Sequence, residues 1–369
     1  MHHYGLTKLH LQNFRSHANL SIDCDAQAII ITGNNGAGKT NILEAISMLA
    51  VGKGIRGANV QEQLRIEGGD FWRIVANLRL NQGECQITSF YDRLNAAKRV
   101  IKIEENILPR QADILQYLSI LWLLPTQAHL FHGAMSDRRK YFDRIVYSFD
   151  ASHSTRINSY EHYVRERGRL LKSGYYDAAW VSSVEAKIAQ YAIEVVRIRL
   201  RIAEILNETI QSLDDIFPKA ELRFNGEVEA ILCHENPIIA LQELLCQRRN
   251  DDMRMGRCSV GAHKSQLQVL WLNNGRDAEL CSTGEQKALL LSILMAQIKS
   301  LQMQRTATSP PIILLLDEMV AHLDYERRSA LFALIQASEI QLFATGTDEA
   351  AFDDLSKFND LSNAKHVRL

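Results

Sequence analysis

The sequence lacks the signals of several large protein classes. Its six cysteines are scattered and form no C-x-x-C pair, which argues against a zinc site and a disulfide framework. No apolar run is long enough to cross a bilayer, and the first residues show no signal-peptide pattern. Glycine and proline are few, which excludes fibrous and disordered classes. We therefore expect a cytoplasmic, globular protein with reduced cysteines and no membrane partner.

An excess of charge of either sign is also absent. With 42 basic and 43 acidic residues the formal net charge is −1, so any nucleic acid would have to be bound by local patches. The basic clusters are Arg138, Arg139 and Lys140; Arg165, Arg169 and Lys172; and Arg197 and Arg201. Glutamates neighbour these clusters, so charge alone favours solvated helix faces.

Patterns of strands and helices alternate at both ends of the chain. Residues 6–11 alternate as a half-buried strand does, and the continuously apolar 28–33 precedes a helical pattern at 39–49. Near the C-terminus, helical patterns at 285–300 and 325–338 flank the apolar strand 312–316. The two ends are therefore expected to form one α/β head.

The middle of the chain carries two other patterns. Residues 71–107 are strand-like and suggest a β-rich insertion. Residues 133–218 are mostly helical, with an apolar stripe typical of a helical hairpin or short coiled-coil arm. The predicted domains are a head of residues 1–132 plus 256–369, and a mainly helical arm of residues 133–255.

A phosphate-binding loop lies between the strand at 28–33 and the helix that follows. The segment matches G-x-x-x-x-G-K-[ST] in full, with Gly33, Asn34, Asn35, Gly36, Ala37, Gly38, Lys39 and Thr40. Backbone N–H groups of such a loop and the helix N-terminus attract phosphate. Lys39 is expected to reach the β- and γ-phosphates, and Thr40 to ligate Mg²⁺. A glycine turn that binds nothing is the disfavoured alternative.

The second half of a nucleotide site is expected where the apolar strand at 312–316 ends. Asp317 and Glu318 follow it directly. We expect Asp317 to hold Mg²⁺ through water and Glu318 to orient or deprotonate the attacking water. An acidic helix cap is the alternative, and the complete phosphate loop makes it the weaker one.

Motifs along nearly the whole chain resemble the RecF family, within the SMC-like branch of ABC-type ATPases. They are "NFRSH" at 13–17, "GNNGAGKTNILEAI" at 33–46, "DRRKYFD" at 137–143, "GAHKSQL" at 261–267, "STGEQKALLLSILMAQ" at 282–297, and "LLLDE" with "AHLD" at 314–324. "GAHKSQL" departs from the family's Gly-Pro-His-Arg pattern, because Ala262 replaces proline and Lys264 replaces arginine. Lysine keeps the positive charge but cannot form the paired hydrogen bonds that an arginine guanidinium offers to a phosphate or carboxylate.

The resemblance implies roles for residues that the motifs alone leave unexplained. Ser282 and Gly284 would cap the γ-phosphate bound by a second copy of the chain, with Asp324 at the facing seam. Gln127 would stand in a Q-loop that senses Mg²⁺, and a solvated loop amide is its alternative. Arg15 would reach the nucleotide phosphates, and a surface salt bridge is its alternative. Thr347 stands where many related transporters place a switch histidine, so hydrolysis is expected to be slow.

The function that the resemblance implies is an ATP-dependent DNA-binding clamp of recombinational repair, replication restart and the SOS response. Such a protein would dimerise with ATP, bind single-stranded, duplex and gapped DNA, hydrolyse ATP weakly, and load a recombinase with RecO-like and RecR-like partners. Two alternatives come from other classes. A nucleotide-binding subunit of a membrane transporter is disfavoured by "NFRSH" and the helical arm. A small-molecule kinase would need neither the "STGEQ" turn nor Asp324.

Overall fold

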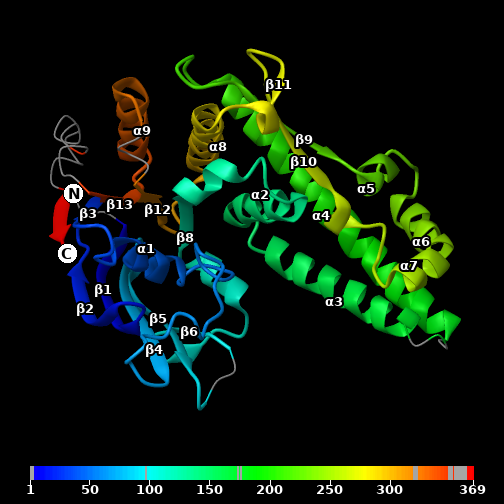
Figure 1. The fold of residues 1–369 in the computed structure, drawn as a ribbon, viewed down its shortest axis with the longest axis horizontal. Coiled ribbons are helices and arrows are strands. Elements are labelled where there is room, and N and C mark those ends of the chain that lie inside the picture. Colours follow the sequence, from blue (N-terminus) through cyan, green and yellow to red (C-terminus); the bar gives the residue numbers. More distant parts are fainter. Residues whose placement is uncertain are drawn as a thin grey trace. The chain divides into compact units, whose positions relative to one another are not determined.

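The chain folds into two compact units, which are described separately (Figure 1). The computed structural model describes residues 4–95, 98–172, 174, 177–318, 323–347, 352 and 364–369. The first unit comprises residues 1–127 and 298–369, and the second comprises residues 128–297. Among the described residues, no helix is long and apolar enough to span a membrane.

A parallel five-stranded sheet forms one layer of the first unit. Its strand order is β14-β3-β13-β12-β8. The strands are β3 (Ala28–Thr32), β8 (Ser119–Leu123), β12 (Ile312–Asp317), β13 (Gln341–Gly346) and β14 (Lys365–Arg368). The strands β3, β8, β12 and β13 are buried throughout, although β8 lies at an edge of the sheet, and this burial explains their continuous apolar runs.

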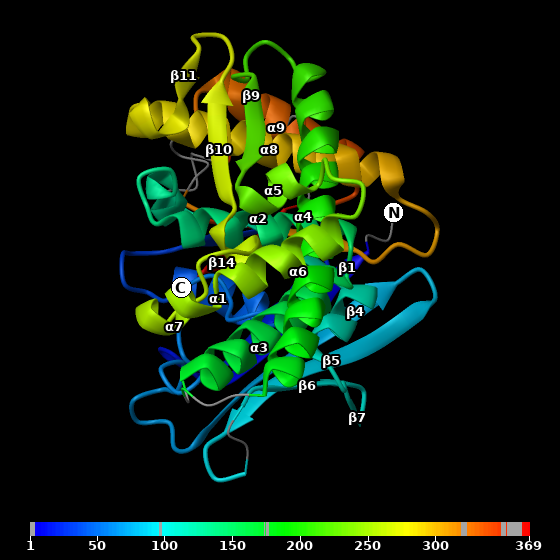
Figure 2. The same ribbon diagram turned by 90° about the vertical axis from the view of Figure 1, so that its right-hand side faces the viewer.

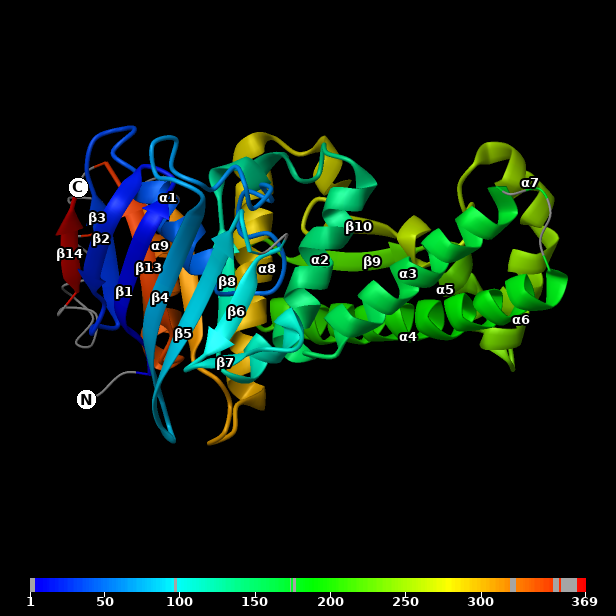
Figure 3. The same cartoon turned by 90° about the horizontal axis from the view of Figure 1, so that it is seen from below.

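An antiparallel six-stranded sheet forms a second layer, with its strands side by side in Figure 3 in the order β2-β1-β4-β5-β6-β7. The strands are β1 (Gly5–Phe14), β2 (His17–Asp23), β4 (Phe71–Leu80), β5 (Gly83–Asp92), β6 (Val100–Ile103) and β7 (Asn106–Ile107). The strands predicted within 71–107 are confirmed, but they do not form a separate insertion, because β4 pairs along β1 from Gly5↔Arg79 to Gln12↔Arg73. The N-terminal hairpin and the later strands are one sheet.

Helix α1 (Lys39–Ser47) joins the core of the first unit. One hydrophobic cluster contains Ile42 and Ile46 of this helix, Leu9 and Trp72 of the antiparallel sheet, and Ile31 of the parallel sheet. The remaining elements of this unit are the 3₁₀ turn η1 (Gln111–Gln116) and α9 (Tyr325–Ala337). Two elements cross the boundaries between the units, namely η2 (Pro125–His129) and α8 (Thr283–Gln304).

The second unit is mainly helical, and Figure 2 shows its long helix α4 with the strands β9 and β10 beside one end. Its helices are α2 (Met135–Phe149), α3 (His153–Lys172), α4 (Ala178–Gln211), α5 (Glu227–Ile231), α6 (Pro237–Gln247) and α7 (Arg249–Met255). Its strands are β9 (Ala220–Asn225), β10 (Gln266–Trp271) and β11 (Arg276–Asp277), and its 3₁₀ turns are η3 (Ala262–Lys264) and η4 (Ala278–Leu280). Helices α3 and α4 form the predicted hairpin.

The contact-based boundary of the second unit lies later in the chain than the predicted arm boundary. The predicted head resumed at residue 256, whereas residues 256–297 lie within the second unit. The physical reason is strand pairing, because β10 pairs with β9 over six residues. Ser292 of α8 also donates a hydrogen bond to the Pro218 carbonyl oxygen at 2.7 Å. The mixed α/β class with a mainly helical second body is confirmed.

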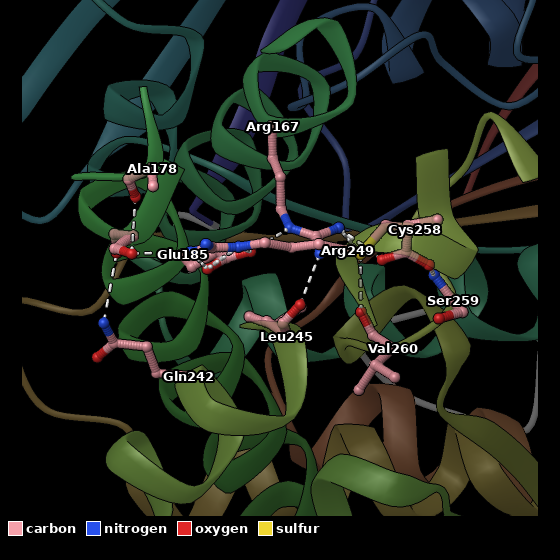
Figure 4. A network of polar contacts seen from close by, with 11 residues as sticks. Arg167, Ala178, Glu185, Gln242, Leu245, Arg249, Cys258, Ser259 and Val260 are labelled. Carbon is pink, nitrogen blue, oxygen red and sulfur yellow. Dashed lines mark hydrogen bonds and ion pairs between the residues drawn. The ribbon is translucent and has the colours of Figure 1, made fainter. Parts of the chain in front are cut away.

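A buried ion network joins α3, α4, α6 and α7 of the second unit (Figure 4). The fully buried Arg167 of α3 donates to Glu185 of α4 at 2.9 Å and to Asp252 of α7 at 2.6 Å. It also donates to the Leu245 carbonyl oxygen at 2.7 Å, and Arg249 pairs with the other side of Glu185. Burying a charge is costly unless it is paired, and here partners from three other helices satisfy the guanidinium of α3, so that it joins four helices.

A second network of hydrogen bonds and ion pairs fixes the "GAHKSQL" segment. Arg199 of α4 pairs with Asp143 at 2.7 Å and donates to the Ala262 carbonyl oxygen at 2.7 Å. His263 lies between the Tyr160 hydroxyl and the Cys258 carbonyl oxygen, and burial lowers its pKa. Lys264 is exposed on this fixed support, so its side chain is presented to solvent.

Candidate nucleotide-binding site

The predicted nucleotide residues of the first unit lie along one edge of its parallel sheet. Because the strands are parallel, their C-terminal ends meet at this edge, where α/β folds place ligands. The register pairs Gly346 with Thr32 and Asp317 with Thr345. Segments far apart in the sequence therefore converge at the end of β3, where the phosphate loop begins.

The phosphate loop has a backbone that its glycines permit. Gly36 and Gly38 have φ angles of 86° and 99°, in the left-handed region that side chains with a Cβ rarely adopt. A Cβ on Gly38 would also lie 2.7 Å from the Ser16 hydroxyl oxygen. A Cβ on Gly36 would meet nothing within 4 Å, so the loop has open space there. This combination leaves backbone N–H groups accessible to an anion.

Lys39 turns its ammonium group back into the loop. Its Nζ donates to the carbonyl oxygens of Gly33 at 2.6 Å and Asn34 at 3.1 Å. The side chain is buried, although Lys39 has no carboxylate partner among the described residues. A cation held over the loop by neutral carbonyls is suited to bind phosphate oxygens.

The acidic strand end and the phosphate loop are in direct contact. The Thr40 hydroxyl donates to the Asp317 carboxylate, with its Oγ1 3.0 and 3.1 Å from Oδ1 and Oδ2. On the other side, the Thr345 hydroxyl donates to Asp317 Oδ1 at 2.7 Å. A hydroxyl and a carboxylate at this distance are the oxygen ligands that Mg²⁺ prefers, so these residues fit a magnesium ion.

Glu318 has an unusual backbone that depends on the same threonine. Its φ is 52°, in the left-handed region, which costs a non-glycine residue about 1 kcal/mol. Its N–H donates to the Thr345 carbonyl oxygen at 3.2 Å and to the Thr345 hydroxyl at 3.1 Å. Strain of this kind gathers at functional sites. Thr345 therefore supports both acidic residues.

Three of the predicted site residues have other contacts or none. Arg15 donates its Nε and Nη2 to Glu44 at 3.0 and 2.6 Å; it forms a salt bridge, as in the alternative, but with a buried carboxylate and not at the surface. Gln127 accepts the Leu124 N–H on its Oε1 at 2.9 Å, directly after β8. Thr347 is exposed beyond the end of β13. Their roles toward nucleotide or magnesium stay predictions.

The "STGEQ" turn, in the second unit, is a capped and exposed helix N-terminus. Ser282 donates to the Glu285 carboxylate from its N–H at 2.7 Å and from its hydroxyl at 2.9 Å, as in a capping box. These bonds lower the pKa of Glu285. The buried Gln286 anchors the turn by donating to the carbonyl oxygens of Ala278 at 2.8 Å and Cys281 at 3.1 Å. Ser282 and Gly284 are exposed.

Among the described residues, no contact requires position 284 to be glycine. A Cβ at this position would meet nothing within 4 Å, and its φ is not in the left-handed region. Glycine lowers the stability of a helix relative to alanine. Its presence in α8 is therefore slightly destabilising, and no contact among the described residues compensates for it. Asp324 has a clear local role, because it caps α9 by accepting the Arg327 N–H at 2.8 Å. Ala321 and His322 of "AHLD" lie outside the described residues.

Sequence reasoning missed two residues of the site. Thr345 contacts Asp317 and Glu318 as described above, and its only signal is its place at the end of the buried strand "QLFATG". His17 lies behind the phosphate loop, with Nε2 3.2 Å from the Gly38 carbonyl oxygen, and burial lowers its pKa. It is the last residue of the "NFRSH" motif.

Known proteins with similar sequences cover nearly the whole chain. The sequence profile described as RecF/RecN/SMC N terminal domain matches residues 5–368. A protein of Rickettsia bellii named DNA replication and repair protein RecF is 36% identical over 96% of this chain and 98% of its own length. A protein of the same name from Mesorhizobium japonicum is 37% identical over 95% of this chain and 93% of its own.

Solved structures show the same fold. The recombination mediator protein RecF of the RecFOR pathway, solved with ATP, has a TM-score of 0.82 at 23% identity and covers 94% of this chain and 93% of its own. The same mediator solved with ATPrS has a TM-score of 0.81 at 22% identity, and the match covers 95% of this chain and 94% of the mediator's chain. An Smc head bound to the winged-helix domain of ScpA has a TM-score of 0.52 at 16% identity.

Proposed function

The chain belongs to the RecF family of DNA replication and repair proteins, and on this premise we propose that it is an ATP-switched DNA-binding clamp. The observation that carries the proposal is the contact between Thr40 and Asp317, which joins the phosphate loop to an acidic strand end 277 residues later. That pair unites the two halves of a P-loop nucleotide site. The RecF mediator solved with ATP has the same fold, which supports ATP as the nucleotide.

Each site residue has a definite task in this proposal. The loop from Gly33 to Gly38 wraps the phosphates, and Lys39 contacts their oxygens. Thr40 and Asp317 hold Mg²⁺, which offsets phosphate charge when bound. Glu318 orients the attacking water and accepts its proton. The hydrolysis is slow, because Thr347 occupies the place of a switch histidine.

ATP joins two copies of the chain in this mechanism. Ser282 and Gly284 offer an exposed helix N-terminus, whose N–H groups and dipole attract phosphate. Gly284 leaves room for a phosphate of the second copy, since none of the described residues fills the space where a side chain at this position would be. Asp324 is also exposed, at the start of α9, and lies at the seam between the copies. ATP then favours the dimer by its difference in affinity for the two states.

DNA would be held through phosphate contacts on the helical unit. The predicted basic residues differ in availability, because Arg138 is buried and donates to Glu279, whereas Arg139 donates to the Ser265 carbonyl oxygen. The exposed candidates are Lys140, Arg165, Arg169, Lys172, Arg197 and Arg201. A dimer doubles this set, so a nearly neutral chain can still present a basic surface. The substrates are single-stranded, duplex and gapped DNA.

The partners are proposed by analogy with the RecF mediator of the RecFOR pathway. RecO-like and RecR-like proteins would act with this chain to load a recombinase in the cytoplasm, in recombinational repair, replication restart and the SOS response. The transporter alternative is not favoured, because the similar proteins of Rickettsia bellii and Mesorhizobium japonicum are named as replication and repair proteins.

Sedimentation velocity with ATP, with ADP and without nucleotide tests the clamp. We expect Glu318→Gln to accumulate dimers with ATP, since binding is kept while hydrolysis is slowed. Ser282→Arg should bind ATP normally and stay monomeric, whereas Ser183→Arg, at an exposed serine of α4, should dimerise. A monomeric Glu318→Gln protein at saturating ATP would refute the clamp. Loss of ATP binding in Ser282→Arg would place the turn at its own chain's nucleotide.

DNA binding is tested separately by titrating duplex and gapped DNA at several salt concentrations. ATP should raise the affinity, and salt should lower it. Arg169→Gln with Lys172→Gln, in the last turn of α3, should reduce the slope of affinity against salt by about two for each copy contacting the duplex. An affinity that responds to neither ATP nor salt would contradict the DNA role and leave the dimer intact.

A further inference from the structure

A cavity in the first unit has an unusual lining. Its volume is about 510 Å³, within the range of small-ligand sites. The lining residues include Lys53, Lys98 and Arg99 together with the amides of Asn59, Gln61 and Gln111. None of the lining residues is Asp or Glu. The cavity therefore carries three positive charges and no negative charge.

One residue that lines the cavity is a buried arginine. Arg99 is 5% exposed and donates to the carbonyl oxygens of Met48 and Ala50 at 3.0 Å each, and to the Gln111 side-chain oxygen at 2.9 Å. No carboxylate pairs with it among the described residues. Buried arginines are normally paired with an acid, and burial without one lowers the pKa of Arg99 to about 10.

The carbonyl partners of Arg99 offset its charge only in part. Met48 caps the C-terminus of α1, where helix carbonyls carry about half a negative charge. Part of the positive charge of Arg99 therefore remains to be balanced, together with the charges of two exposed lysines that line the cavity. Neither Lys53 nor Lys98 forms an ion pair with a described residue.

The wall that encloses the cavity is fixed by hydrogen bonds. The segment between α1 and β4 is attached to the Ser47 hydroxyl through the Ile55 N–H at 2.9 Å. Farther along, the Trp72 indole N–H donates to the Val60 carbonyl oxygen at 2.8 Å. Arg15 also donates to the Glu62 carbonyl oxygen at 2.5 Å. A preformed cationic cavity loses little entropy on binding an anion.

We propose that this cavity is a second anion site, which binds a terminal phosphate or polyphosphate group at a place separate from the phosphate loop. The Gln61 and Gln111 amides can donate hydrogen bonds, while Arg99 and the two lysines supply positive charge. Because Arg99 is buried, a slender terminal group can approach it more closely than the side of a duplex can. Such a group can come from a free nucleotide-like ligand or from a 5′-phosphorylated nucleic-acid end.

The test is calorimetric titration of the full chain at constant ionic strength, in a Lys39→Ala background that weakens the phosphate loop. The probes are pyrophosphate and a single-stranded decanucleotide with and without a 5′-phosphate. Lys53→Gln with Lys98→Gln should weaken pyrophosphate binding about tenfold or more, which corresponds to about 1.4 kcal/mol. Lys53 and Lys98 are exposed, so the fold should be retained.

A matched control removes two lysines that do not line the cavity, by Lys8→Gln with Lys102→Gln. It should leave the affinity unchanged. Binding of the decanucleotide only when it carries a 5′-phosphate would assign the site to nucleic-acid ends, and binding of pyrophosphate alone would assign it to a free ligand. The proposal is overturned if neither probe binds, or if the double variant of Lys53 and Lys98 binds as well as the control variant.

Discussion

Replacing Gly284 by alanine should stabilise the monomer and weaken the ATP-dependent dimer. Gly284 is the second residue of α8, its side-chain space is open, and its φ is not left-handed. Alanine loses less backbone entropy in a helix, so we expect about 0.5 kcal/mol of added stability. In the proposed dimer, the new methyl group stands between the helix N–H groups and the partner's phosphate. The dimer should therefore weaken about tenfold, or about 1.4 kcal/mol.

Urea unfolding measures the first effect and sedimentation with ATP measures the second. Gly168→Ala is the matched control, because Gly168 lies in α3 and its Cβ would also meet nothing within 4 Å. That variant should gain about 1 kcal/mol of stability and dimerise normally. If Gly284→Ala is stabilised and still dimerises with unchanged affinity, the turn does not contact a phosphate. If it is destabilised, the space at Gly284 is not open.

Three further predictions address the networks, the acidic strand end and the cap. Arg167→Met leaves the buried Asp252 without its ion pair, while Glu185 keeps Arg249, and should cost about 3 kcal/mol in urea unfolding; Arg165→Met, at an exposed pair, should cost under about 0.5 kcal/mol. Thr345→Val should slow single-turnover phosphate release about tenfold while ATP binding is kept, because Asp317 and Glu318 each lose a hydrogen bond. The pKa of Glu285 is lowered by folding, so its stabilisation is present above its unfolded pKa of about 4.3 and is lost as pH falls through the folded pKa. The stability difference between wild type and Glu285→Gln should accordingly shrink on acidification.

The local pattern of the sequence predicted elements well and long-range pairing less well. The phosphate loop, the following helix and the buried strand ending in Asp317 were all predicted, because each has a strong local signal. The strands β8 and β14 were not predicted. β14 is short, and neither strand reveals by itself that it joins the parallel sheet. The strands within 71–107 were predicted, but their pairing with the N-terminal strand was not, since nothing in 71–80 identifies β1 as the partner.

The fact that local patterns do not reveal long-range pairing also explains which residues of the candidate site were predicted. Asp317 was predicted from its place after an apolar strand, whereas Thr345 becomes visible only through the register that sets it opposite Asp317. Arg15 illustrates the reverse, because its motif suggested phosphate contact while the fold pairs it with a buried carboxylate from α1. Motifs identify residue types, and the fold decides which partner is within reach.

The Glu285 carboxylate occupies the donors of Ser282 that the proposed dimer would use to bind phosphate. The Ser282 N–H and hydroxyl both donate to Glu285, so they are occupied within the chain. A phosphate that binds these donors must displace the carboxylate, because two anions about 4 Å apart repel by about 1 kcal/mol in water and more where water is excluded. In the proposed mechanism, ATP from the partner therefore competes with an internal cap. Under this proposal the closed dimer would form only when the nucleotide interactions exceed the loss of that cap, and association would therefore depend on the full charge of the γ-phosphate.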